Sequence, residues 1–232
     1  MRWAFGILVP VFAALFSSAA GAQSSDRDWR QCNSDTDSDS AIIESCTSFI
    51  RLGQGTDATL AVAHKNLCLA YNDKGDHDRA IRECDEAIAR DPDFTEAFLF
   101  RGHAYFNKRD YDRAIGDFDR AVALGSVAAS TLVERGAAYH RKGDEAHAIA
   151  DLDKAISLDS GDATAFYIRG AAHQAQSDND RAIRDYDQAL KLAPRFAACQ
   201  YRRGVLKRQL GDIRGGDADI AQARRIDPDI GK

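Results

Sequence analysis

Proline is scarce in this sequence: four residues in 232, and β-branched residues rarely follow one another. Since proline interrupts helices and β-branched runs favour strands, both scarcities favour a helical protein. The sequence also lacks an excess of basic residues, because 31 lysines and arginines stand against 36 acidic residues, giving a net charge of −5. Phosphate binding requires a basic surface, so nucleic acid is not expected as a partner.

The sequence lacks the common catalytic and cofactor-binding motifs. It contains no C-x-x-C or H-E-x-x-H metal motif, no G-x-S-x-G nucleophile motif, no phosphate loop and no dinucleotide fingerprint. The composition, 44% hydrophobic and 29% charged, is that of a globular chain. We therefore expect a protein that is not an enzyme, with no cofactor and no metal.

The N-terminus has the pattern of an export signal. Arg2 precedes the apolar stretch Trp3 to Phe16, and the small residues Ala20, Gly21 and Ala22 follow. This pattern predicts a signal peptide over residues 1–22, with an uncleaved membrane anchor as the alternative. The mature protein is then periplasmic or secreted and has no stable membrane insertion.

Small and polar residues recur along the chain every 34 residues. One column consists of Ala87, Ala121, Ala155, Ala189 and Ala223. A second consists of Ala80, Ala114, Ala148 and Ala182, closed by Gly216. Further columns consist of Cys68, Gly102, Gly136, Gly170 and Gly204, of Asp76, Asp110, Asp144, Asp178 and Asp212, and of Pro92, Ser126, Ser160, Pro194 and Pro228. Such a period indicates a row of similar structural units.

Each unit reads as two helices joined by a turn. Phe98, Gly102 and Tyr105 lie on one face of a first helix, and Ile115 and Phe118 begin the apolar stripe of a second. The aspartate column follows the turn, where a side-chain oxygen caps a helix. The small-residue columns let the two helices cross closely.

The pattern resembles the tetratricopeptide repeat. The stretches Arg101-Gly102-His103-Ala104-Tyr105 and Asp110-Tyr111-Asp112-Arg113-Ala114-Ile115 follow the bacterial form of this repeat closely. Five units are expected, over residues 61–94, 95–128, 129–162, 163–196 and 197–230, after a capping segment over 23–60. The resemblance implies an all-α, right-handed superhelical solenoid of antiparallel helix pairs that binds proteins in a concave groove.

Both ends of the row carry features of caps. Residues 37–52 align with a second helix that has no first helix before it, and in the last unit Asp217 and Arg224 replace apolar residues. The acidic run at Asp35, Asp37 and Asp39 is read as a helix cap. A calcium loop would need Gly and Glu where Ser40 and Cys46 stand.

Five cysteines in an exported chain permit disulfides. A bridge between Cys32 and Cys46 is expected to tie the N-terminal residues to the capping helix. For Cys68 and Cys84 two readings stay open, a bridge across the first helix pair and two buried thiols. Cys199 is left over, either inert or reactive.

Two charged columns predict ion pairs between neighbouring units. The arginine column consists of Arg101, Arg135, Arg169 and Arg203, and the aspartate column of Asp85, Asp119, Asp153 and Asp187. Leu67 interrupts the first column at one end and Ala221 the second at the other. Since each column stops where its partner would be missing, every arginine is expected to pair with the aspartate 16 residues before it.

The first helices are expected to line the binding groove. The candidate partner-binding residues are Lys65, Asn72, Leu99, His103, Phe106, Val133, His140, Tyr167, Gln174, Tyr201 and Arg208. His103 and His140 are expected as solvated groove residues, and Leu99 and Val133 carry the alternative of packing between helices. The set has few fixed charges, so weak salt dependence is expected. The carboxylate-clamp version of the repeat is not expected, since Leu69, Phe100, Ser130 and Glu134 occupy its other positions besides Lys65.

These features favour an exported scaffold or adaptor of the cell envelope that binds a protein or peptide segment. Two alternatives from other classes stay open: a receptor for a small ligand in the groove, and an envelope hydrolase or metalloenzyme.

Overall fold

The structure is a computed structural model that describes residues 25–34, 36–53, 55–126 and 128–232. Within these ranges every regular element is a helix, which confirms the all-α fold class. The predicted signal peptide (1–22) lies outside the described residues. The chain divides into two compact units at Ala104 and Tyr105, and each unit is described by itself.

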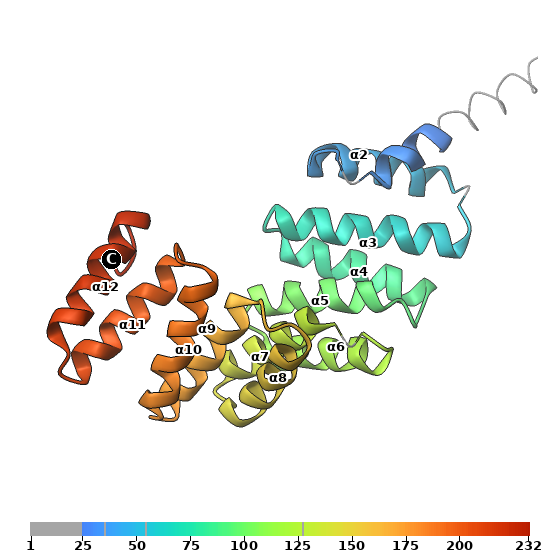
Figure 1. Ribbon diagram of the computed structural model, residues 1–232. Coiled ribbons are helices and arrows are strands. Elements are labelled where there is room, and N and C mark those ends of the chain that lie inside the picture. The colour runs from blue at the N-terminus through green and yellow to red at the C-terminus, as the bar shows by residue number, and fades with distance from the viewer. Residues whose placement is uncertain (1–24, 35, 54, 127) are drawn as a thin grey trace, which may run out of the picture. The chain divides into compact units, whose positions relative to one another are not determined.

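Unit 1 contains the N-terminal helices (Figure 1). Residues 25–32 are helical and are followed by α2 (Asp39–Leu52), α3 (Asp57–Asp73), α4 (His77–Arg90) and α5 (Thr95–Asn107), whose last turn belongs to unit 2. Helices α3 and α4 form a pair, and α2 packs against α3. The capping helix differs from its prediction in two respects. Its N-cap is Ser38, one residue later than expected, and a helix over 25–32 precedes it.

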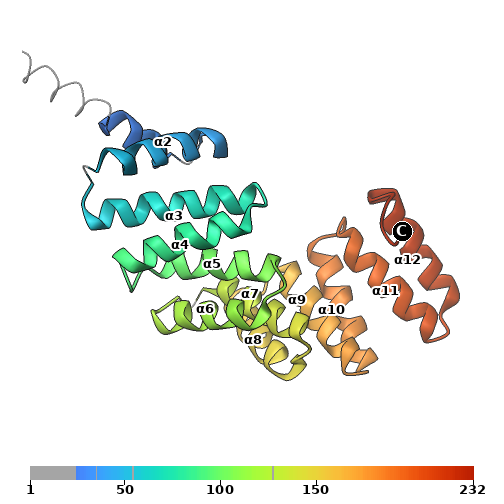
Figure 2. The ribbon, with the colours of Figure 1, turned by 180° about the vertical axis from the view of Figure 1, so that it is seen from behind.

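Unit 2 consists of helix pairs that follow one another (Figures 1 and 2). After the end of α5 come α6 (Tyr111–Ala123), α7 (Ala129–Lys142), α8 (Glu145–Leu158), α9 (Ala163–Ala175), α10 (Asn179–Leu192), α11 (Ala197–Gln209) and α12 (Ile213–Ile226). The pairs are α7 with α8, α9 with α10 and α11 with α12, and each pair also contacts the next. First helices α7 and α9 touch directly. The unit is therefore a helical-repeat solenoid.

The aspartate column caps the second helices, as predicted. The side chains of Asp76, Asp110, Asp144, Asp178 and Asp212 each accept a hydrogen bond of 2.9–3.3 Å from the backbone N–H three residues later. In every case the preceding residue has a positive φ, between 62° and 95°. Glycine tolerates this conformation, but Arg109 and Ser177 hold it in two of the five turns. The turn geometry is thus imposed by the repeat, even where its residue is unfavourable.

Glycine is required where the helices of a pair cross. A Cβ atom added to Gly136 would lie 3.0 Å from Leu152, one on Gly170 would lie 2.9 Å from the Tyr186 ring, and one on Gly204 would lie 2.8 Å from Ile220. Cys68 and Cys84 hold the two corresponding positions of the first pair. Their sulfur atoms lie 2.14 Å apart, at bonding distance, which decides between the two open readings. The disulfide thus fills the space that a large side chain against glycine fills elsewhere.

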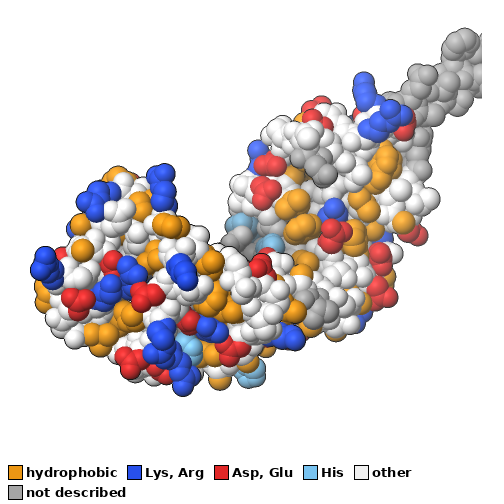
Figure 3. All heavy atoms as spheres, in the orientation of Figure 1, with side chains coloured by type: hydrophobic (Ala, Val, Ile, Leu, Met, Phe, Trp, Pro, Cys, Tyr) orange, Lys and Arg blue, Asp and Glu red, His pale blue; other side chains and the backbone are white. Residues whose placement is uncertain are grey.

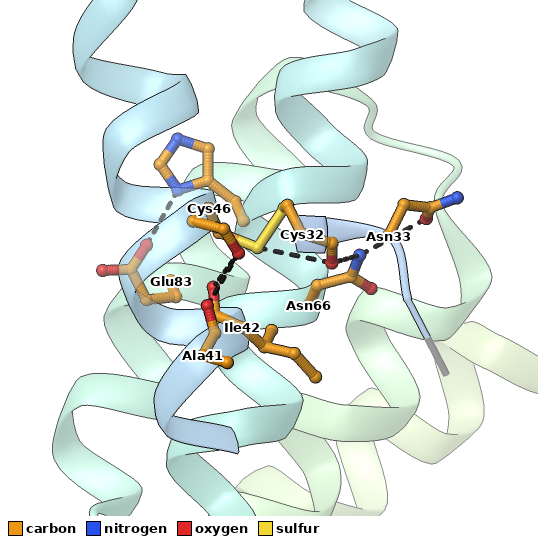
Figure 4. The surroundings of a disulfide bond; sticks show 9 residues. Cys32, Asn33, Ala41, Ile42, Cys46, Asn66 and Glu83 are labelled. Carbon is orange, nitrogen blue, oxygen red and sulfur yellow. Dashed lines mark hydrogen bonds and ion pairs between the residues drawn. A yellow bond between two sulfur atoms is a disulfide. The ribbon is translucent and has the colours of Figure 1, made fainter. Parts of the chain in front are cut away.

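The predicted N-terminal disulfide is also present. The sulfur atoms of Cys32 and Cys46 lie 2.08 Å apart, and both residues are buried in the core of unit 1. Figure 4 shows the bridge with Asn66 beside it. The Asn66 amide donates hydrogen bonds of 2.9 Å to the carbonyl oxygen of Cys32 and 3.4 Å to the side-chain oxygen of Asn33. Helix α3 therefore holds the residues before α2 by both packing and hydrogen bonds.

All four predicted arginine–aspartate pairs between successive helix pairs are confirmed. The closest nitrogen and oxygen atoms lie 2.6 Å apart in Arg101–Asp85, 2.7 Å in Arg135–Asp119, and 2.6 Å in Arg169–Asp153 and Arg203–Asp187.

A second carboxylate, which the sequence analysis missed, binds three of these arginines more completely. Arg135 donates two hydrogen bonds of 2.7 Å to Asp151 of its own helix pair. Arg169 does the same to Asp185 and Arg203 to Asp219, at 2.6–2.9 Å. The Asp151 side chain is 12% exposed and that of Asp119 is 52% exposed. The buried partner within the pair is therefore the stronger one.

In the first helix pair a histidine replaces the missing arginine. Leu67 stands in the arginine column, and Glu83 occupies the place of Asp151. His64, one helical turn before Leu67, has its Nδ1 atom 2.8 Å from Glu83 Oε2. The carboxylate thus keeps a nitrogen partner although the column is interrupted.

We predict that Arg135→Ala lowers the free energy of unfolding by about 1–3 kcal/mol, because it leaves the buried Asp151 carboxylate without its partner. Urea denaturation followed by circular dichroism measures the change. Adding Asp151→Asn should recover part of the loss, since the unpaired charge is then removed. Arg181→Ala is the control, because its pair with Asp178 is exposed. Equal effects of Arg135→Ala and Arg181→Ala would contradict the burial argument.

A second prediction concerns the five cysteines. Burial raises the pKa of the Cys199 thiol to about 12, so this thiol is unreactive in the folded protein. Alkylation of oxidised protein should label no cysteine when folded, Cys199 alone when denatured, and all five after reduction. Reduction should also loosen unit 1 selectively, since a loop of about 15 residues closed by a disulfide contributes about 3 kcal/mol. Hydrogen exchange of unit 2 should stay unchanged; a uniform loss over both units would be evidence against local stabilisation.

Candidate functional site

A hollow in unit 2 brings together residues from four successive first helices. Its volume is about 190 Å³. It lies where the end of α5, the second half of α7, the middle of α9 and the beginning of α11 approach one another. Its lining consists of Phe106, Ala137, His140, Arg141, Thr164, Tyr167, Ile168, Ala171, Phe196 and Arg202.

An aromatic cluster forms part of this lining. The ring centroid of Tyr167 lies 4.8 Å from that of Phe196 and 6.1 Å from that of the buried Tyr186. The Arg202 guanidinium carbon lies 5.8 Å from the Tyr167 ring centroid. The Tyr186 hydroxyl donates a 2.7 Å hydrogen bond to the side-chain oxygen of Gln174. Burial raises the pKa of Tyr186, so this hydroxyl stays protonated as a donor. The buried Tyr186 thus holds the cluster on its inner side, while Tyr167 and Phe196 line the hollow.

Three residues of one predicted groove column are each held in place by the residue five positions later. His140 Nδ1 lies 2.7 Å from Glu145 Oε2. Phe106 packs edge-on against Tyr111 at 5.6 Å between ring centroids. In unit 1, Asn72 shares a 3.2 Å hydrogen bond with His77, and its amide donates to the Phe100 carbonyl oxygen at 2.9 Å. These three helix pairs therefore orient the side chain at this position through different interactions.

The structure brings three of the eleven predicted binding residues into the hollow: Phe106, His140 and Tyr167. Tyr201 and Arg208 line a separate hollow of about 490 Å³ on α11 and α12, where Arg208 lies 3.4 Å from Asp217. In unit 1, Lys65 lines a third hollow of about 250 Å³ near the N-terminal disulfide.

The remaining predicted residues occupy other places. Leu99 and His103 are half-buried on α5 in unit 1. Gln174 bonds Tyr186 rather than facing the hollow. Val133 was predicted to bind the partner, but it is 7% exposed and belongs to the core around Leu152. It therefore packs between helices.

Seven of the ten residues that line the hollow were not predicted, and those among them with a charged or aromatic side chain are Arg141, Phe196 and Arg202. Phe196 lies at the N-cap of α11, whereas Asp162 occupies the N-cap of α9. At the position of Arg202, the two preceding units carry Ile168 and Glu134. Since none of these columns keeps one residue type along the chain, periodicity carried no signal. The one available signal was sequence proximity, because Arg202 adjoins Tyr201 and Arg141 adjoins His140.

No three metal-ligating side chains converge anywhere in the described part of the chain. Among the described residues, no helix is both long and apolar enough to cross a membrane.

Comparison with protein families agrees with this geometry. Two tetratricopeptide-repeat family models match the chain, one over residues 66–129 and 99–163 and the other over residues 163–196. The matches together span more than half of the chain. The chain belongs to the tetratricopeptide-repeat family. Proteins of this family bind protein or peptide partners and are generally non-enzymatic. A sequence search of curated proteins gives no match.

Solved structures of tetratricopeptide-repeat proteins share the fold. A repeat protein from Parabacteroides merdae is 15% identical, with a TM-score of 0.74 over 89% of this chain and 80% of its own. MamA from Desulfovibrio magneticus is 20% identical, with a TM-score of 0.67 over 77% and 99%. YrrB, described as having an unusual peptide-binding site, is 20% identical, with a TM-score of 0.62 over 81% and 95%.

His173, on the same helix as Tyr167, is a buried histidine of unit 2. It is 5% exposed, with Nε2 3.9 Å from Asp185, and its Nδ1 has no hydrogen-bond partner among the described residues. Burial lowers the pKa of His173 below 6.5, although Asp185 acts in the opposite direction. The unfolded state therefore binds more protons than the folded state once the pH falls below about 6.5.

We predict that the free energy of unfolding decreases between about pH 7 and about pH 5, and that His173→Gln makes this slope shallower. Urea titrations at several pH values measure it. His147→Gln is the matched control, because the His147 side chain is exposed. If His147→Gln flattens the slope as much as His173→Gln, burial of His173 is not the cause.

Proposed function

We propose that this protein is an exported scaffold or adaptor of the cell envelope that binds a peptide or protein segment in the hollow of unit 2. The observation that carries the proposal is the convergence of Phe106, His140 and Tyr167 from three first helices on one hollow. Aromatic side chains bury large rigid areas with few rotamers to freeze, and they dominate binding hot spots.

The family and the chemistry of the hollow both support a binding role. Tetratricopeptide-repeat proteins bind protein or peptide partners, and the similar YrrB is described as having a peptide-binding site. The hollow has aromatic walls, and no metal cluster forms among the described residues. We therefore propose a binding protein rather than a hydrolase, and a macromolecular segment rather than a small ligand enclosed by the protein.

The proposed location rests on the N-terminal pattern and on the cysteines. Residues 1–22 have the composition of a signal peptide. Four of the five cysteines lie at disulfide-bonding distance in two pairs, and such bonds persist in oxidising compartments. These features support a periplasmic or secreted protein, with a partner in the same compartment.

The double substitution Phe106→Ala and Tyr167→Ala should abolish partner binding while the helical fold persists, because both side chains line the hollow. Proximity labelling in the native compartment identifies the partners of the unchanged protein, and capture of these partners by purified variants measures the loss. A loss of about 2 kcal/mol or more per hot-spot residue corresponds to at least about thirtyfold weaker binding.

The matched control replaces Leu158 and Leu210 with Ala, since both are exposed apolar residues of unit 2 outside the hollow. The control should capture the partner normally, and circular dichroism should give the same helical signal for all variants. Normal capture by the Phe106 and Tyr167 variant would place the partner on another surface and refute the proposed site.

A further inference from the structure

The hollow of unit 2 has an electrostatic character opposite to that of the whole chain. The chain has a net charge of −5, yet no aspartate or glutamate lines this hollow, whereas Arg141, Arg202 and His140 do. The two other hollows described above carry carboxylates: Asp217 in the C-terminal one, and Asp37, Asp39 and Asp73 in the one near the disulfide. The cationic lining is therefore a local feature.

The two arginines of the hollow are available to a ligand. His140 is held by Glu145, and the neighbouring Lys142 by Asp112 at 2.6 Å. Arg135, Arg169 and Arg203, close by on the same first helices, are each bound to two carboxylates. In contrast, Arg141 and Arg202 are exposed and form no ion pair with any described residue. Arg202 also interacts with the aromatic cluster, over the Tyr167 ring and at the Tyr186 hydroxyl. The donors that remain on the two guanidinium groups can bind a carboxylate from outside.

The hollow has room for one large side chain. Its volume of about 190 Å³ is somewhat more than the ~150 Å³ of an apolar cavity that accepts a benzene molecule. Phe106, Tyr167 and Phe196 supply aromatic walls, and Ile168 adds aliphatic surface. An aromatic or large aliphatic side chain can therefore enter, with the two arginines beside it.

We propose, on the basis of the binding function inferred above, that the hollow recognises a peptide segment in which an acidic residue flanks a large apolar residue. The apolar side chain contacts Phe106, Tyr167 and Phe196. The carboxylate binds Arg141 and Arg202, whose planar donors match its two oxygens. This charge contribution reverses the expectation of weak salt dependence, which was based on a set of residues that lacked both arginines.

The test uses the full-length mature protein and a fluorescein-labelled peptide with blocked ends, Gly-Ser-Glu-Phe-Glu-Ser-Gly. Fluorescence anisotropy should show saturable binding. Replacing both Glu by Gln, or Phe by Ala, should weaken binding about tenfold, which corresponds to about 1.4 kcal/mol. Raising the salt concentration from about 0.05 M to about 0.5 M should weaken the acidic peptide selectively, since the ion pairs are exposed.

Protein variants assign the binding to the two arginines. Arg141→Gln with Arg202→Gln should weaken the acidic peptide about tenfold and leave the Gln peptide unchanged. The matched control, Arg184→Gln with Arg214→Gln, removes the same charge from exposed positions on the second helices α10 and α12 and should bind normally.

Several results would overturn the inference. These are absence of saturable binding, equal affinity for the Glu and Gln peptides, and equal loss in the control variant. Tighter binding of a single-stranded dT oligonucleotide would assign the hollow to nucleic acid. A dimer, detected by sedimentation, that dissociates in the Arg141 and Arg202 variant would assign it to a second copy.

The inference and the proposed function fail separately. If the native partner is lost by the Phe106 and Tyr167 variant but kept by the Arg141 and Arg202 variant, the proposed site stands and acidic recognition is wrong. If both variants keep the native partner, both proposals are wrong.

Discussion

The close crossing of the two helices in each pair is the contact on which the rest of the architecture depends. At Gly136, Gly170 and Gly204 an added Cβ atom would meet Leu152, Tyr186 or Ile220 at 3.0 Å or less. The arginine before each glycine is thereby brought next to the aspartate before each large residue, as Arg135 is to Asp151. Because the backbones approach so closely, the guanidinium forms two short hydrogen bonds to the buried carboxylate within the pair.

The same arginine also joins successive pairs. Its remaining donor reaches the aspartate of the preceding pair at 2.6–2.7 Å, so one guanidinium holds three helices. The net gain from such a group is modest, but loss of any partner leaves a charge unsatisfied, which specifies the register of the stack. First helices spaced in this way set the distance between Phe106, His140 and Tyr167, and the hollow follows from that spacing.

Periodicity predicted what the repeat itself requires. The aspartate caps, the crossing glycines and the arginine pairs lie in columns of one residue type, since each unit poses the same packing problem. The periodicity did not predict the buried carboxylate that binds each arginine within its own helix pair. Its column begins with Glu83 and continues with aspartates, so it is not of one residue type, and it lacks the interruption at one end that indicated the pairing between units. Val133 shares a column with Tyr167 but is buried, because a short side chain stays between the helices where tyrosine extends to the surface.

The candidate site was the least predictable part for the opposite reason. Residues that pack must repeat, whereas residues that face a partner are released from that constraint and differ from unit to unit. The groove column reads Asn72, Phe106, His140, Gln174 and Arg208, and its members have different local partners. In unit 2, around α7 and α9, aromatic residues and two arginines without an ion pair among the described residues share one hollow that no carboxylate lines. In a repeat protein, the positions that break the period are therefore the ones that give a single place along the stack a specificity of its own.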